Sequence, residues 1–157
     1  EVGRRIHGRA MHMPEFNLIG KFRQMKIITG NVRGAGSTTF RDHFLDLYDI
    51  HNPDVVIVVE TKIGGQAAVN VYVSLPFSGY KIVDSVGRRG GLYLLWHPNE
   101  VRVNIISKTE QEIHGLVQVS SDTPSWFLSA VYASPNYNNR VILWENLKHV
   151  ASQNSLP

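Results

Sequence analysis

Two side chains that could serve a metal or phosphate site each follow a short apolar run. Glu60 comes directly after the run at 54–59, and Asn31 lies in a glycine-punctuated turn after the run at 25–29. A carboxylate can bind a hard cation such as Mg²⁺, which takes one or two carboxylates together with water and substrate oxygens. An amide can hydrogen-bond a phosphate or orient a carboxylate. Each residue also has a plainer alternative: Glu60 can pair with Lys62 or a nearby arginine, and Asn31 can stabilise its turn.

A second pair of polar side chains, Tyr132 and Asn136, follows the apolar run at 126–131. Their phenol and amide groups can donate hydrogen bonds to phosphate oxygens. The alternative is an aromatic ring at the edge of the core and an asparagine that shapes the turn after Pro135. None of these residues is diagnostic alone.

Three arginines, Arg33, Arg88 and Arg89, stand in glycine-containing turns. Such side chains can contact a phosphate backbone, although a solvated turn is the simpler explanation. The seven histidines show no metal-ligand spacing, such as two of them one helical turn apart around a glutamate. A Walker-type phosphate loop and a nucleophile elbow are also missing from the sequence, which argues against two common classes of hydrolase.

The run at 54–59 predicts the strand that positions Glu60. Its β-branched residues do not alternate with polar ones, which indicates burial on both faces, as in a middle strand of a layered α/β domain. A strand at 25–29 and a helix precede it. This strand–helix–strand order predicts neighbouring parallel strands joined by a right-handed crossover. Asn31 and Glu60 would then emerge at the same edge of the sheet.

The remaining elements are predicted from hydrophobic spacing and turn residues. After the first strand we expect a turn at 30–36 and a helix that is capped by Ser37, Thr38 or Thr39 and ended by Asn52-Pro53. A short helix near 66–73 follows the second strand, and then come strands at 80–85 and 91–96 joined by a turn at 86–90, a half-buried strand at 101–105, and a hairpin of strands 113–119 and 125–132. The last element is a helix at about 141–151 that packs through Leu143, Trp144, Leu147 and Val150. Consecutive hairpins of this kind build one face of a sandwich, so the sequence predicts a mixed α and β domain.

The composition places the 157 residues in a single domain. There are no cysteines, which excludes disulfides and thiolate metal sites and fits an intracellular setting. The net charge of +3 mildly favours an anionic partner such as nucleic acid. Part of the positive charge lies in residues 1–24, which we expect to form a flexible basic extension. No apolar run approaches the ~20 residues of a membrane-spanning helix, so no membrane partner is expected.

Taken together, these features resemble the endonuclease/exonuclease/phosphatase family, with the closest likeness to the AP-endonuclease-like domain of plant LINE-type (non-LTR) retrotransposons. Four stretches carry the resemblance: MKIITGNVRG at 25–34, PDVVIVVETK at 53–62, GGLYLLW at 90–96 and SAVYASPN at 129–136, followed by Arg140 and Leu143-Trp144. They occur in the family's order and with plausible spacing from residue 25 to the C-terminus.

The resemblance implies an α+β fold, the four-layer α/β/β/α sandwich of DNase I-like proteins, with a divalent-metal phosphodiesterase site. Glu60 would bind Mg²⁺ or Mn²⁺, and Asn31 would help hold the metal and the substrate phosphate. Tyr132 would contact the phosphate, and Asn136 would support its loop. The metal would polarise a phosphoryl oxygen while water activated by an aspartate attacks in line, which nicks DNA.

The sequence also departs from the family pattern. The Gly-Asp-x-Asn motif, whose aspartate orients the attacking water, and the C-terminal Ser-Asp-His motif are missing, and Gly30 stands where relatives commonly carry a bulky aromatic. The resemblance therefore covers the N-terminal part of the domain, residues 25–157, with the C-terminal half missing. We expect such a partial sandwich to be marginally stable or to aggregate, because it exposes unpaired strand edges and apolar surface.

Two functions follow as expectations. The first is an endonuclease-family domain that nicks DNA in its intact form and is inactive as this fragment. The second is a non-catalytic retroelement remnant that binds nucleic acid weakly through Arg33, Arg88 and Arg89. A phosphatase of the same superfamily, acting on sugar or lipid phosphates, is disfavoured by the plant-retroelement character of the motifs. We expect a reverse transcriptase domain downstream in the intact element and a nuclear location.

Overall fold

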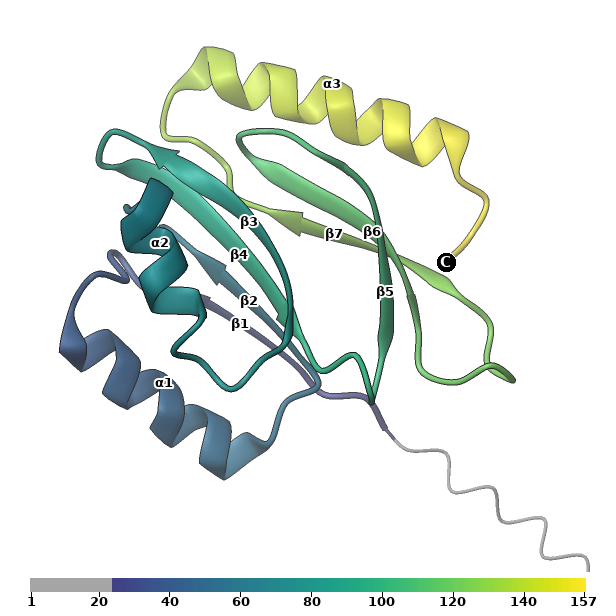
Figure 1. Cartoon of the computed structure of the whole chain (residues 1–157). Coiled ribbons are helices and arrows are strands. Elements are labelled where there is room, and N and C mark those ends of the chain that lie inside the picture. Colours follow the sequence, from purple (N-terminus) through teal and green to yellow (C-terminus); the bar gives the residue numbers. More distant parts are fainter. Residues whose placement is uncertain (1–23) are drawn as a thin grey trace, which may run out of the picture.

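The computed structural model describes residues 24–157 and arranges them in two β-sheets and three helices (Figure 1). In chain order the elements are β1 (Ile27–Asn31), α1 (Thr38–His51), β2 (Val55–Val59), α2 (Gly65–Tyr72), β3 (Gly79–Val86), β4 (Arg89–Trp96), β5 (Arg102–Lys108), β6 (Glu112–Gln118), β7 (Trp126–Val131) and α3 (Tyr137–Gln153). The predicted basic extension lies outside the described residues, apart from its last residue. Within residues 24–157, no helix is both long enough and apolar enough to cross a membrane.

The strands form a first sheet with the order β1-β2-β4-β3 and a second sheet with the order β5-β6-β7. β1 and β2 are parallel neighbours joined through α1, as the sequence predicts, and the other strand pairs are antiparallel. The predicted strands are all present, close to their expected bounds. The mixed α and β class is confirmed.

β2 is buried on both faces because it lies between two apolar layers. Val56 and Val58 pack with Phe44 in the cluster beneath α1 and α2. Val55 and Ile57 belong to the cluster between the two sheets. Figure 1 shows α1 and α2 on one side of the first sheet and the second sheet on the other. This arrangement explains why the apolar run at β2 does not alternate with polar residues.

The ends of α1 follow local chemistry. Ser37, one of the three predicted caps, accepts a hydrogen bond on its hydroxyl oxygen from the backbone N–H of Phe40 at 3.1 Å. Asn52 ends the helix in the left-handed conformation, with φ of 44°, and its N–H donates to the Tyr48 carbonyl. The predicted start and stop of this helix are therefore confirmed.

α3 differs from the prediction in two ways. It begins at Tyr137 rather than near 141, because Asn136 caps it by accepting hydrogen bonds from the N–H groups of Asn138 and Asn139. Leu143 is buried as expected, but Trp144 is 58% exposed and does not pack into the core. Apolar side chains therefore remain on the outer face of this helix.

Gly30 borders a small apolar cavity between the first sheet and α1. The cavity measures about 60 Å³, and Ile28, Phe44 and Leu47 are among its apolar lining residues. A Cβ added at Gly30 would meet no atom within 4 Å. Gly30→Leu is therefore expected to raise the free energy of unfolding by about 1–2 kcal/mol, because it fills this space and favours the strand. Urea denaturation measures the change.

Gly87→Leu is the matched control for this stabilising change. The surroundings of Gly87 are equally open, but its φ is 62°, a conformation that disfavours a side chain. The control should lower the free energy of unfolding. Equal destabilisation by Gly30→Leu and Gly87→Leu would show that the cavity does not accept a side chain.

Candidate metal and phosphate site

The C-terminal ends of β1 and β2 meet at one edge of the first sheet. Asn31 lies opposite Val59, one residue before Glu60. The segment after β1 also lies beside the segment after β2, because the Ala35 N–H donates to the Thr61 carbonyl at 2.8 Å. The prediction that Asn31 and Glu60 emerge at the same edge is confirmed.

The start of β4 holds the opposite side of this segment. The Thr61 N–H donates to the Gly91 carbonyl at 3.3 Å, and the Lys62 N–H donates to the Gly90 carbonyl at 3.0 Å. Glu60 and Lys62 both have left-handed backbones, with φ of 58° and 56°. Such conformations cost about 1–3 kcal/mol each for residues other than glycine and persist where surrounding contacts fix them. Glu60 is therefore presented from a strained, tightly held segment.

The Glu60 carboxylate is accessible, with 26% of its side chain exposed. The Lys62 ammonium lies 3.8 Å from it, so the plainer alternative, an exposed ion pair, is present in the structure. Within residues 24–157, no three His, Cys, Asp or Glu side chains gather in a way that could hold a metal. The donors at this edge, one carboxylate and the Asn31 amide, suit Mg²⁺ only if a bound phosphate supplies further oxygens.

Tyr132 lies close to Glu60, although it comes from the end of β7 in the second sheet. Burial raises the pKa of Tyr132, and the charge of Glu60 raises it further, whereas the Gly90 backbone and Arg89 lower it. A Cβ added at Gly90 would lie 3.2 Å from the Tyr132 ring. The phenol therefore stays protonated near neutral pH and can donate a hydrogen bond.

A polar cavity of about 160 Å³ opens beside Tyr132. Asp84, Arg89, Ser134 and Asn136 are among the residues that line it. The Asn136 side-chain oxygen is engaged at the start of α3, as described above, so this residue shapes the loop after β7 rather than offering a free acceptor. Its predicted supporting role fits this geometry, and a direct phosphate contact stays a prediction.

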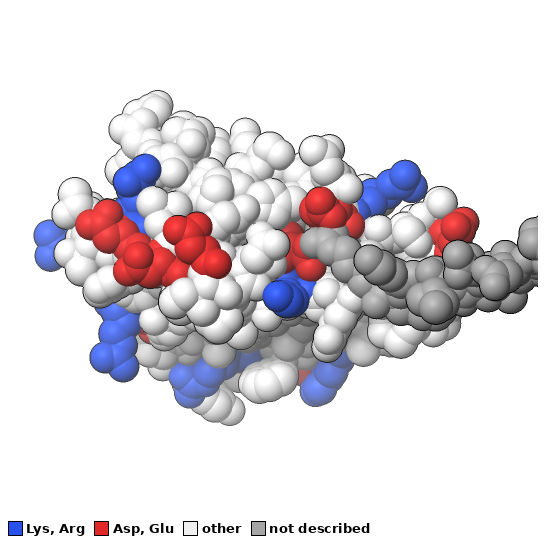
Figure 2. Space-filling view, turned by 90° about the horizontal axis from the view of Figure 1, so that it is seen from below, with Lys and Arg blue, Asp and Glu red and all other residues white. Residues whose placement is uncertain are grey.

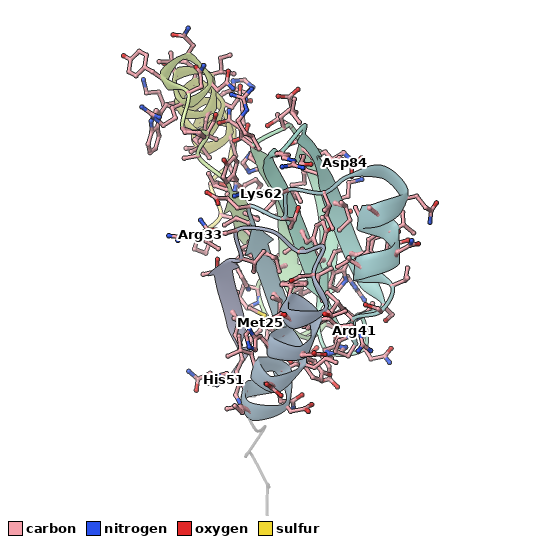
Figure 3. All side chains as sticks on the ribbon, turned by 90° about the vertical axis from the view of Figure 1, so that its left-hand side faces the viewer. Met25, Arg33, Arg41, His51, Lys62 and Asp84 are labelled. Carbon is pink, nitrogen blue, oxygen red and sulfur yellow. The ribbon has the colours of Figure 1, made fainter. Side chains whose placement is uncertain are left out.

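The three predicted arginines are not gathered in one place. Arg89 lines the cavity beside Tyr132, whereas Arg88 is exposed in the turn between β3 and β4. Arg33 is exposed after β1, and its N–H donates to the Asn31 side-chain oxygen at 3.2 Å. Figure 3 shows Arg33, Lys62 and Asp84 toward the same end of the sheets, with Met25 and His51 toward the other. Of the three, Arg89 lines the cavity beside Tyr132.

Gln111 positions the Tyr132 loop and escapes prediction from the sequence. Its backbone carbonyl accepts from the Tyr132 N–H at 2.7 Å, and its side-chain oxygen accepts from the Ser134 N–H at 3.0 Å. Its side-chain amide donates to the Asn139 carbonyl at 2.8 Å. A glutamine before a strand carries no distinctive spacing, so the sequence offers no signal for this role.

Two buried hydroxyls lie behind Glu60. Thr61 and Tyr93 are both fully buried, and their hydroxyl groups neighbour each other without good hydrogen-bond geometry. Burial raises the pKa of Tyr93 from its ordinary value of 10 to about 12, and the charge of Asp84 adds to the effect. The phenolate is therefore disfavoured inside the fold.

This raised pKa predicts a loss of stability in alkali. Tyr93 ionises near pH 10 in the unfolded chain but only near pH 12 in the folded chain. The contribution of protonated Tyr93 to the free energy of unfolding is therefore complete below pH 10 and is lost as the pH rises toward 12. The loss attributable to this residue is about 2–3 kcal/mol. Urea denaturation between pH 8 and 12 should show a shallower decline in Tyr93→Phe, and identical profiles would contradict the prediction.

No protein-family model and no curated protein matches this sequence significantly. Several solved structures resemble the fold, among them the following two. An AP endonuclease from Leishmania major aligns with 69% of this chain and 40% of its own, at 18% identity and a TM-score of 0.52. A conserved protein of unknown function from Enterococcus faecalis aligns with 82% of this chain and 63% of its own, at 17% identity and a TM-score of 0.56. The chain thus spans less than two thirds of either protein and shares the fold of an AP endonuclease.

Proposed function

We propose that this chain is a partial nuclease-type domain that binds the DNA backbone at the edge formed by the ends of β1, β2 and β7. Two observations support the proposal on a fold shared with an AP endonuclease: Asn31 lies beside the end of β2, which leads into Glu60, and Tyr132 lies close enough to Glu60 to feel its charge. The AP endonuclease-like domain of LINE-type retrotransposons is the source that its motifs favour. In the intact element, the rest of a four-layer sandwich and a reverse transcriptase domain would follow, and the protein would act in the nucleus.

Each residue has a defined task in this proposal. Glu60 and Asn31 would hold Mg²⁺ or Mn²⁺ together with a phosphate oxygen, and the cation would neutralise charge on that phosphate. The Tyr132 phenol would donate to a second phosphate oxygen, and Arg89 would add positive charge beside it. Arg33 and Arg88 would contact flanking phosphates. Figure 2, seen from below, shows a cluster of acidic side chains on the side of the molecule where α1 lies, and such a cluster repels a polyanion.

Hydrolysis is not expected from these residues alone. Lys62 partly balances the charge of Glu60, and the nearby carboxylate of Asp84 lines the cavity beside Tyr132. Within residues 24–157, no three His, Cys, Asp or Glu side chains form a group that could hold a metal. We therefore infer that the chain binds DNA without cleaving it. This function is consistent both with an origin in the endonuclease family and with a non-catalytic remnant.

The test combines a nicking assay with DNA binding. Supercoiled plasmid with Mg²⁺ or Mn²⁺ should stay intact. Fluorescence anisotropy of a DNA duplex should show weak, salt-dependent binding that Arg89→Ala reduces, with the salt slope falling by about one. Arg41→Ala, an exposed arginine on α1, is the matched control and should leave binding unchanged. Metal-dependent nicking that Glu60→Ala removes would show an active enzyme, and equal losses in Arg89→Ala and Arg41→Ala would contradict the assigned surface.

A further inference from the structure

A groove of about 390 Å³ lies where α2, β3 and the end of β5 meet. α2 contributes Tyr72 to its lining, β3 contributes Tyr80 and Lys81, and β5 contributes Lys108. Every lining residue lies between positions 65 and 108, so the walls of the groove belong to the described part of the chain. The groove therefore combines aromatic and basic side chains on one surface.

Contacts beyond the strand pairing fix the walls of this groove. The Lys108 ammonium reaches β3 and donates to the Ile82 carbonyl at 3.0 Å. The Ser85 N–H of β3 donates at 3.2 Å to the carbonyl of Ile63, which precedes α2. The β5 lysine and the segment before α2 are therefore both held against β3.

Tyr80 presents an aromatic ring that other rings support from behind. Tyr80 is 48% exposed, and its ring centroid lies 4.2 Å from that of Tyr72, at an interplanar angle of 33°. Tyr72 in turn meets the buried Tyr93 ring edge-on at 6.5 Å. Hydrogen bonding to Tyr80 raises the pKa of Tyr72, so this phenol stays uncharged near neutral pH. A fixed, exposed ring of this kind is a surface on which a nucleic-acid base can stack.

Two lysines place positive charge beside the ring pair. Lys108 is exposed and Lys81 is half-buried, and the ion pairs formed within residues 24–157 include neither ammonium. The bond to Ile82 uses one of the three N–H groups of Lys108, so the others stay available. Aromatic rings next to such ammonium groups are the combination with which proteins bind single-stranded nucleic acid.

Asp84 connects this groove with the candidate site, because it lines both the groove and the polar cavity beside Tyr132 (Figure 3). We propose that the groove binds an unpaired strand of DNA that continues from the duplex held at the candidate site. Tyr80 would stack on a base, and Lys81 and Lys108 would contact phosphates of the same strand. The continuation rests on the proposed function, whereas the groove itself can bind an isolated strand.

The chemistry of the groove favours an unpaired strand over other polyanions. A base inside a duplex is stacked on both faces, so only an unpaired strand offers a free face to Tyr80. The Asp84 carboxylate repels phosphates and acidic polypeptides, but it can accept a hydrogen bond from the amino group of cytosine. An unpaired run of cytosines therefore suits this groove.

Fluorescence anisotropy with three kinds of DNA tests the proposal. They are a blunt duplex, the same duplex with unpaired arms of about six deoxycytidines on both strands at one end, and a deoxycytidine oligomer of the same length as one arm. The natural chain should bind the forked duplex about tenfold more tightly than the blunt duplex, since one stacked base contributes about that factor. It should also bind the oligomer, which offers no duplex to the candidate site.

Substitutions assign this gain to the groove. Tyr80→Ala should abolish the gain and Tyr80→Phe should keep it, because the phenylalanine retains the ring. Lys81→Gln should lower the salt slope of oligomer binding by about 0.7. Trp144→Ala and Lys148→Gln, which remove an exposed aromatic residue and an exposed lysine of α3, are the matched controls and should leave the gain and the slope unchanged.

The outcomes separate this inference from the proposed function. A natural chain that binds the oligomer but not the blunt duplex would keep the groove and contradict the proposed function. Equal affinity for the forked and blunt duplexes, or a gain that survives both Tyr80→Ala and Lys81→Gln, would overturn the groove. Tighter binding of a glutamate-rich peptide than of the oligomer would also overturn it, because the groove would then be a site for an acidic polypeptide.

Discussion

Gly91→Ala is expected to leave most of the chain unfolded at 25 °C. A Cβ at this position would collide with the Thr61 hydroxyl and lie 3.3 Å from the Lys62 backbone nitrogen. Thr61 is fully buried and cannot move aside easily. The φ of Gly91 is 87°, which adds a backbone penalty for any side chain. The combined cost is about 4 kcal/mol or more, a large part of the stability of a small domain.

A double-mutant cycle separates the steric and backbone components of this cost. Thr61→Ala removes the colliding hydroxyl, so Gly91→Ala should be less harmful in the Thr61→Ala background by about 2 kcal/mol. Gly87→Ala, at a positive φ with open surroundings, should cost only about 1 kcal/mol. Circular dichroism and urea denaturation provide the measurements. A folded Gly91→Ala protein with near-natural stability would show that the β2–β4 junction is looser than described.

The framework around Glu60 could be predicted because few physical rules determine it. An unbroken β-branched run can be accommodated only between two apolar layers, and β2 lies between such layers. A strand–helix–strand unit has one common handedness, so β1 and β2 are parallel neighbours and Asn31 lies beside the end of β2. These rules place Asn31 and Glu60 without any knowledge of the second sheet.

The rest of the site depends on contacts between distant segments, which no local pattern encodes. The approach of Tyr132 to Glu60 requires the packing of the second sheet on the first. Gln111 positions the Tyr132 loop through three hydrogen bonds, and its neighbours in the sequence do not reveal them. The left-handed backbones of Glu60 and Lys62 oppose the local preference of both residues, so only the surrounding structure explains them.

α3 shows why helix ends and faces are hard to predict. Amphipathic spacing suggested that Trp144 packs inward, but Asn136 caps α3 through the N–H groups of Asn138 and Asn139 and sets the start of the helix four residues earlier than expected. Beneath α3 the second sheet presents polar groups, and polar contacts replace some of the expected apolar ones. One of them joins the Asn146 side-chain amide of α3 to the Glu112 carboxylate at 2.7 Å. The helix is therefore attached through a buried polar cluster as well as through Leu143.

Glu112 is the centre of that cluster, and it is 1% exposed. One carboxylate oxygen accepts from Asn146 and, at 3.2 Å, from the Thr109 hydroxyl. The other oxygen lies 3.2 Å from Nε2 of His114, which is 2% exposed, in a geometry that is close enough for an ion pair but poor for a hydrogen bond. The His114 Nδ1 lies 2.9 Å from the Ser129 hydroxyl. Removing the carboxylate would leave several buried groups without their partner.

Glu112→Ala is accordingly expected to lower the free energy of unfolding by about 3–5 kcal/mol, because breaking one side of a buried pair leaves the other uncompensated. Replacing both partners with apolar residues of similar size, as in Glu112→Leu with His114→Phe, should recover most of this loss, since neither desolvated group remains. Glu145→Ala is the matched control. Glu145 and Lys148 form an exposed ion pair on α3, which should contribute less than about 0.5 kcal/mol to the free energy of unfolding. Urea denaturation at pH 7 compares the variants. If the double variant were as unstable as Glu112→Ala, packing around the cluster rather than its unpaired polar groups would be the cause.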